Sequence, residues 1–163
     1  MADTLRPCLT FKDRAEEAVK FYVSIFPNSK ITDLTRYEKD GGPIEKGKLL
    51  SAIFELDGRE FRAFDGGESF TFSEGISLDV TCKTQAEVDK YWTALTANGG
   101  EEGPCGWLKD RFGVSWQIVP EQLGRMLTND KDGNSEAAMQ AMLKMKKIDI
   151  ASLEKAYRGS PVA

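Results

Sequence analysis

The 163-residue chain contains no histidine. Histidine is the side chain that titrates near neutral pH, and it is the commonest protein ligand for transition metals. Its absence excludes Ser-His-Asp and Cys-His nucleophile systems, and it excludes metal sites built on a pair of histidines. Composition alone therefore removes several large classes of enzyme.

Cysteine is scarce as well. Cys8, Cys82 and Cys105 are odd in number and far apart, which favours reduced thiols in a reducing compartment over a disulfide framework. No run approaches the roughly 18 apolar residues of a membrane span, and the first residues lack the apolar segment of a signal peptide. We therefore expect a cytoplasmic protein with no membrane partner.

The chain also lacks an excess of positive charge. It has 22 Lys and Arg against 26 Asp and Glu, a formal net charge of -4, and the two signs are mixed along the sequence. Nucleic-acid binding usually requires a basic stripe, so we expect no nucleic-acid partner. The 40% of hydrophobic residues is ordinary for one globular domain over residues 1–163.

The hydrophobic pattern shows the same order of elements twice. Residues 5–66 predict a strand at 7–11, a helix at 15–26 with Asp13 as its N-cap, and strands at 31–37, 49–56 and 60–65. Residues 76–120 predict a strand at 76–81, a helix at 85–97, a short segment near Glu102, and strands at 106–109 and 114–119. Each half is a βαβββ module, so we predict an α+β fold.

Residues 121–163 differ in character from both modules. Methionine recurs at positions 126, 139, 142 and 145, a helix begins near Ser135, and Asp149 is a candidate cap for a last short helix to about Tyr157. A methionine stripe at helical spacing is typical of a core or a subunit interface. We expect a helical C-terminal extension that packs, in part across a homodimer.

Alternation along the predicted strands separates an apolar face from a polar one. In the strand from Ile76, Ser77 and Asp79 lie opposite the apolar residues. Arg62 takes an equivalent place in the earlier strand at 60–65, and Gln117 does so in the last strand. Such groups either line a binding site or face water on the open side of an antiparallel sheet.

The two modules and the run Cys105-Gly-Trp-Leu-Lys-Asp-Arg-Phe-Gly-Val-Ser-Trp-Gln-Ile-Val-Pro120 resemble the vicinal oxygen chelate superfamily. That superfamily includes glyoxalase, bleomycin-resistance proteins and extradiol dioxygenases. The resemblance is greatest to its PhnB-like branch, which is labelled demethylubiquinone methyltransferase-like. It implies two tandem βαβββ modules that form curved mixed sheets around a cleft.

In metal-dependent members, four inward-facing His and Glu ligands come from the first and last strand of each module. Carried over to this chain, within about one residue of register, those positions hold Pro7, Arg62, Ser77 and Gln117. A set made of proline, arginine, serine and an amide is not one that binds a divalent ion. We therefore expect no metal and no cofactor.

If the sheets curve as the resemblance implies, their polar faces line the cleft. The expected ligand-binding residues are Arg62, Ser77, Asp79 and Gln117, rimmed by Phe11, Phe64 and Trp107. An apolar wall with a few hydrogen-bonding groups suits a small organic molecule, and Arg62 favours one that carries an oxyanion.

Three functions remain open from the sequence. The first is a metal-free small-molecule-binding protein of this fold, whose ligand and reaction are not identified. The second is methyl transfer, as the family label suggests, although neither a parallel-sheet nucleotide fold nor its glycine-rich turn is present in the pattern. The third is a dimeric interaction module that binds no small ligand.

Overall fold

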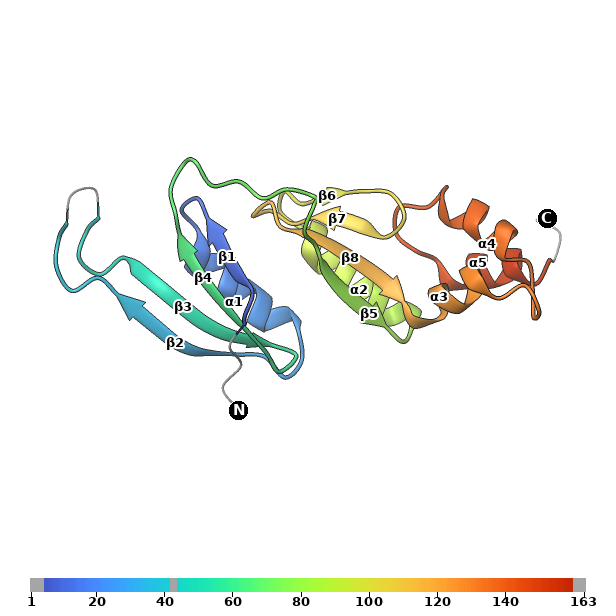
Figure 1. Cartoon of the computed structure of the whole chain (residues 1–163), viewed down its shortest axis with the longest axis horizontal. Helices are drawn as coiled ribbons and strands as arrows, with labels where there is room; N and C mark the ends of the chain where they lie inside the picture. Colours follow the sequence, from blue (N-terminus) through green and yellow to red (C-terminus); the bar gives the residue numbers. More distant parts are fainter. Residues whose placement is uncertain (1–4, 42–43, 160–163) are drawn as a thin grey trace. The chain divides into compact units, whose positions relative to one another are not determined.

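The computed structural model describes residues 5–41 and 44–159. The chain divides into two compact units, Met1–Thr71 and Phe72–Ala163, and each unit contains one four-stranded sheet (Figure 1). This confirms the predicted α+β class with two tandem modules and a helical extension. Across the described ranges, no helix is both long and apolar enough to cross a bilayer.

Unit 1 is the first βαβββ module. It consists of β1 (Cys8–Phe11), α1 (Ala15–Ile25), β2 (Lys30–Arg36), β3 (Leu49–Leu56) and β4 (Arg59–Asp65). The strand order is β1-β4-β3-β2; β1 pairs with β4 in parallel, and the other pairs are antiparallel. The parallel pair places the last strand beside the first, so residues from both ends of the module lie next to each other, with β1 at the edge of the sheet and β4 inside it.

Helix α1 packs against one face of this sheet through its apolar stripe, in which Val19 and Tyr22 are fully buried. Its N-cap position is Arg14, which makes no capping bond, and not the expected Asp13. The helix start is stabilised from β4, because the Ala15 amide donates to Asp65 Oδ1 at 2.7 Å. A carboxylate that is distant in sequence thus caps the N-terminus of α1 in place of a neighbouring residue.

Unit 2 repeats this arrangement. It consists of β5 (Leu78–Cys82), α2 (Gln85–Thr96), β6 (Glu101–Glu102), β7 (Trp107–Lys109) and β8 (Ser115–Pro120). Its strand order, β5-β8-β7-β6, again pairs the first and last strands in parallel. Helix α2 begins with a local capping box, in which Thr84 accepts from the Glu87 amide and Glu87 accepts from the Lys83 amide.

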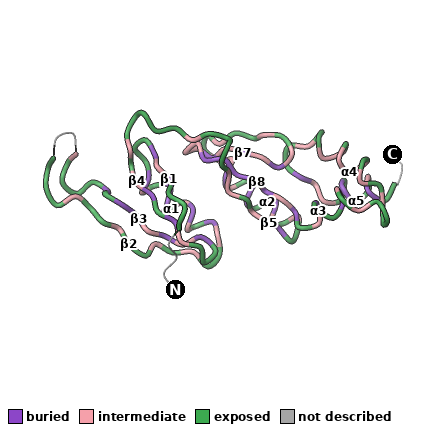
Figure 2. Tube along the Cα trace, viewed as in Figure 1, coloured by how far each residue is buried: buried purple, intermediate pink, exposed green. Residues whose placement is uncertain are grey.

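Three short helices follow in the same unit: α3 (Glu121–Thr128), α4 (Ser135–Met142) and α5 (Ile150–Tyr157). They enclose a core of their own, made of Leu123, Met126, Ala138, Ile148, Leu153 and Tyr157. Met142 and Met145 pack against this core, so methionines of the predicted stripe contribute to packing within the extension. Figure 2 shows the buried residues of this core along α3, α4 and α5.

Candidate functional site

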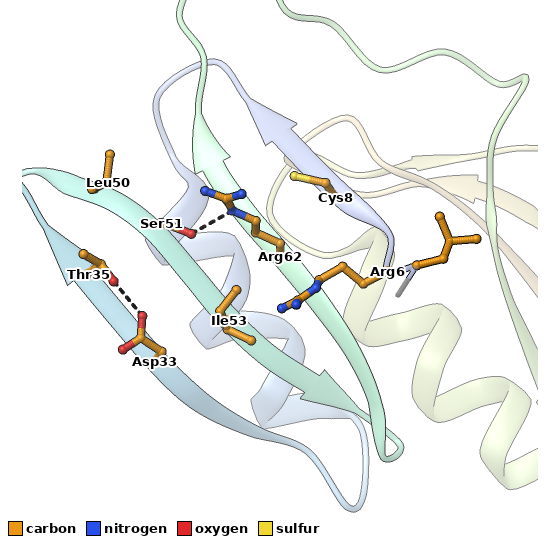
Figure 3. Close-up of a pocket in the computed structure, with 9 residues that line it drawn as sticks. Arg6, Cys8, Asp33, Thr35, Leu50, Ser51, Ile53 and Arg62 are labelled. Atoms are coloured by element: carbon orange, nitrogen blue, oxygen red, sulfur yellow. Dashed lines mark hydrogen bonds between the residues drawn. The ribbon is translucent and has the colours of Figure 1, made fainter. Parts of the chain in front are cut away.

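The open face of the unit 1 sheet is hollowed by a cavity of about 620 Å³ (Figure 3). Its lining comes from the segment before β1 and from all four strands, and consists of Leu5, Arg6, Cys8, Asp33, Thr35, Leu50, Ser51, Ile53 and Arg62. We call the cavity that these residues line the Arg62 cavity. It mixes aliphatic side chains with three charged ones, which is typical of a small-molecule site.

Cross-strand register explains why these residues meet. Cys8 on β1 is paired with Arg62 on β4, Arg62 with Ile53 on β3, and Ile53 with Asp33 on β2. Residues opposite one another in a sheet project to the same face. The four side chains therefore form one row across the sheet, with the arginine near its middle.

The guanidinium of Arg62 is held in a defined orientation. Its Nε donates to Ser51 Oγ at 2.9 Å, and its Cζ lies 5.7 Å from the centroid of the Phe64 ring, within the range of a cation–π contact. In Figure 3, Arg62 and Ser51 extend toward each other from adjacent strands. With Nε engaged, the two terminal amino groups form the edge that is offered to a ligand.

The other groups of the cavity differ in charge and exposure. Arg6 pairs with Glu60 at 2.6 Å, each about two-fifths exposed, while the Asp33 carboxylate accepts a hydrogen bond from Thr35 Oγ1 at 2.7 Å. Leu5 is 90% exposed, and Cys8 carries an exposed free thiol beside Arg62. The cavity thus has a cationic side and an acidic side.

In unit 2 the structure brings together four of the predicted site residues. Asp79 on β5 is paired with Gln117 on β8, and Gln117 with Trp107 on β7, so the three form a row like that of unit 1. Gln117 Nε2 donates to Ser77 Oγ at 2.8 Å. The amide side chain is therefore oriented by a residue just before β5.

Three other predicted residues lie in unit 1. Arg62 and Phe64 share the open face, where the ring lies beneath the guanidinium. Phe11 is 2% exposed and belongs to the core with Leu9, on the face opposite Cys8, so it does not line the Arg62 cavity. Sequence reasoning missed Cys8, Asp33, Thr35, Ser51 and Ile53, which only the strand pairing places beside Arg62.

The residues at the superfamily's metal positions do not form a metal-binding set. A guanidinium such as that of Arg62 is cationic and has no lone pair for a metal ion, and the Gln117 amide is hydrogen-bonded to Ser77. Over residues 5–41 and 44–159, no three His, Cys, Asp or Glu side chains gather closely enough to bind a metal ion.

Trp107 follows a loop that is held by the C-terminal extension. The amide of Cys105 donates to Met145 O at 2.8 Å, and that of Gly106 donates to Lys146 O at 2.7 Å. Both loop residues have positive φ, 55° and 85°, and a Cβ at Gly106 would lie 2.8 Å from the Ile118 carbonyl oxygen. The loop conformation therefore needs glycine at 106 and is stabilised by external acceptors.

Side chains of α2 also bind the segment between α4 and α5. Gln85 donates from Nε2 to Ile148 O at 3.1 Å and accepts at Oε1 from the Ile150 amide at 2.9 Å. An ion pair between Lys147 and Asp89, at 2.6 Å, lies alongside. We call these contacts, together with those to Cys105 and Gly106, the 145–150 clamp.

Comparison with known proteins agrees with this architecture. Residues 3–119 match the model of the family described as 3-demethylubiquinone-9 3-methyltransferase. A PhnB protein from Bacillus cereus is 35% identical, with a TM-score of 0.65 over 72% of this chain and 99% of that chain. No curated protein matches the chain.

More distant structures share the fold alone. A protein from Pseudomonas aeruginosa is 22% identical, with a TM-score of 0.59 over 72% of this chain and 96% of that chain. The fosfomycin resistance protein FosX from Listeria monocytogenes is 18% identical, with a TM-score of 0.56 over 79% of this chain and 100% of that chain. The predicted resemblance to the vicinal oxygen chelate superfamily is confirmed by the family match and by the Bacillus cereus PhnB protein. The chain therefore belongs to the family described as 3-demethylubiquinone-9 3-methyltransferase, the PhnB-like branch of that superfamily.

Proposed function

We propose that this protein binds a small organic molecule without a metal ion, and that the Arg62 cavity holds an oxyanion of that molecule. The observation that carries the proposal is the Nε bond from Arg62 to Ser51 at 2.9 Å. It fixes the guanidinium plane within a cavity of about 620 Å³. A pre-oriented guanidinium loses little further freedom on binding, which favours affinity.

The chemistry of the site supports a carboxylate or phosphate-type ligand. The two terminal amino groups of Arg62 match the spacing of two oxygens on one such group. Arg6 also lines the cavity but is paired with Glu60, which leaves Arg62 as the main cationic group, and Ile53 and Leu50 supply aliphatic surface for the rest of the molecule. In unit 2, we propose Ser77, Asp79, Trp107 and Gln117 as further polar and aromatic contacts for small molecules.

The test uses Arg62→Ala, with Arg59→Ala as the matched control. Arg59 is an exposed arginine of the same strand that does not line the cavity. Wild type and both variants are titrated with a panel of short-chain carboxylates and phosphate monoesters. Binding is followed by NMR shifts and by protection of Cys8 from iodoacetamide, quantified on the Cys8 peptide.

We expect saturable protection of Cys8 by at least one probe. The Arg62→Ala variant lacks the main ionic partner of the probe, so its Kd for that probe should be about tenfold higher or more. The Arg59→Ala variant should bind the probe as tightly as wild type. The proposal fails if no probe protects Cys8, in which case an interaction module without a small ligand is the better function. It also fails if Arg62→Ala binds as tightly as wild type.

The family description favours methyl transfer as a second candidate. This function requires a methyl donor, for which S-adenosylmethionine is the direct probe. Calorimetric titration showing specific binding in the micromolar range would support methyl transfer. Absence of heat in titrations up to millimolar donor would leave ligand binding as the function of this chain.

A further inference from the structure

The Arg62 cavity contains two opposite charges that no other described residue neutralises. Arg6, its second guanidinium, is already paired with Glu60. Arg62 is bonded to the neutral hydroxyl of Ser51, and Asp33 to the neutral hydroxyl of Thr35. Neither Arg62 nor Asp33 has an ion pair among residues 5–41 and 44–159.

The two charges lie at a separation set by the sheet. Asp33 is paired with Ile53, and Ile53 with Arg62, so one strand lies between the two residues. Neighbouring strands are about 4.8 Å apart, which places the two backbones roughly 10 Å from each other. Ile53 supplies an aliphatic surface between them, and Asp33 and Arg62 both line the cavity (Figure 3).

We infer that the cavity selects a dipolar molecule, whose oxyanion binds Arg62 and whose ammonium group binds Asp33, with a short aliphatic chain across Ile53. This inference rests on the proposed function and narrows its ligand to the class of ω-amino acids and related aminoalkyl oxyanions. Asp33 is exposed, so a ligand with an anionic end alone loses only the modest stabilisation that an ion pair with this carboxylate would add.

The charge of Asp33 also has a simpler possible role, which is to protect the edge of the sheet. Asp33 lies on β2, an edge strand of the sheet, and charged side chains on edge strands discourage pairing with other chains. Edge protection requires only a charge at position 33. Ligand recognition requires that the charge be negative and that it act together with Arg62, so the two roles make different predictions.

The experiment compares amino acids with their counterparts that lack the amino group. γ-Aminobutyrate, δ-aminovalerate and ε-aminocaproate are titrated against butyrate, valerate and caproate by NMR at neutral pH. Exposed ion pairs contribute modestly. We therefore expect at least one amino acid to bind wild type about threefold to fivefold more tightly than its counterpart.

Asp33→Asn should remove this preference while leaving the Kd of the simple carboxylates unchanged. Asp57→Asn is the matched control, because it removes an exposed carboxylate of the same unit outside the cavity, and it should retain the preference. Asp33→Lys, which keeps a charge on the edge strand, should disfavour the amino acids.

Two outcomes would overturn the inference, and they are distinguishable. If simple carboxylates bind in an Arg62-dependent manner but wild type shows no preference, or Asp33→Asn retains it, the dipolar ligand is wrong while the proposed function stands. If neither series binds, the inference fails, and the proposed function fails with it when the phosphate monoesters do not bind either.

Discussion

Asp110 shows how one carboxylate organises a turn. Its Oδ1 accepts from the amides of Phe112 and Val114 at 2.8 and 3.1 Å, and its Oδ2 accepts from Trp116 Nε1 at 2.8 Å. The residue is 3% exposed. The turn from Asp110 to Gly113, where φ is 88°, is therefore fixed by side-chain bonds that reach into β8.

Asp110→Ala should lower the free energy of unfolding by about 3 kcal/mol, because it leaves buried donors without acceptors. Urea unfolding monitored by tryptophan fluorescence measures this change. Asp132→Ala, which removes an exposed carboxylate of the same unit, is the control and should cost far less. Equal midpoints for the two variants would show that the bonds to Asp110 contribute nothing.

At the level of elements, the 145–150 clamp joins α2, the loop before β7 and the C-terminal extension. Its contacts are mainly bonds to backbone groups, and Gln85 makes two of them with one side chain. The clamp holds Cys105 and Gly106 in left-handed conformations directly before Trp107. The extension thereby supports the loop that leads into Trp107, a predicted ligand contact in β7.

Gln85→Ala should lower the free energy of unfolding by about 2 kcal/mol, since a partly buried carbonyl and a partly buried amide lose their partners. It should also increase the rate at which Cys105, which is partly exposed, reacts with iodoacetamide. Gln140→Ala, at an exposed position of α4, is the matched control. A Cys105 rate equal to that of the control would contradict the clamp. Cys82 should stay unreactive in all variants, because burial is the main cause that raises the pKa of its thiol to about 11.

At the scale of the whole molecule, the extension lies beyond residues 3–119 that match the family, yet it is integrated into unit 2. Truncation after Pro120 removes the acceptors of Cys105 and Gly106 and exposes the surface that Ile148 covers. We expect a marked fall in Tm, measured by calorimetry. An unchanged Tm would mean that the extension does not contribute to the stability of unit 2.

The oligomeric state stays a prediction at this scale. A homodimer of the 18.1 kDa chain should give twice that mass by light scattering after size exclusion. The same measurement on the truncated chain separates two roles of the methionines. Loss of the dimer would place part of the stripe at the subunit interface, whereas a mass twice that of the truncated chain would restrict it to the core in which Met126 is buried.

The sequence by itself determined the features that depend on neighbouring residues. The order of strands and helices depends on such short-range patterns. Asp57 and Gly58, which form the turn between β3 and β4, both have positive φ, and Asp149 caps the last helix by accepting from the Ser152 amide. Each of these features involves groups within a few positions of one another. Their conformations follow from local sterics and short-range hydrogen bonds. This is why the α+β class could be predicted without coordinates.

Only the tertiary structure decided which distant residues share a site. The capping of α1 by Asp65 joins residues 50 positions apart, and the row Cys8, Arg62, Ile53 and Asp33 depends on three strand registers. A shift of one residue in any register would turn a side chain to the opposite face. Sequence alternation therefore identified Arg62 as a polar residue of the open face, while its partners Ser51, Cys8 and Asp33 were set by strand pairing, which is a property of the whole sheet.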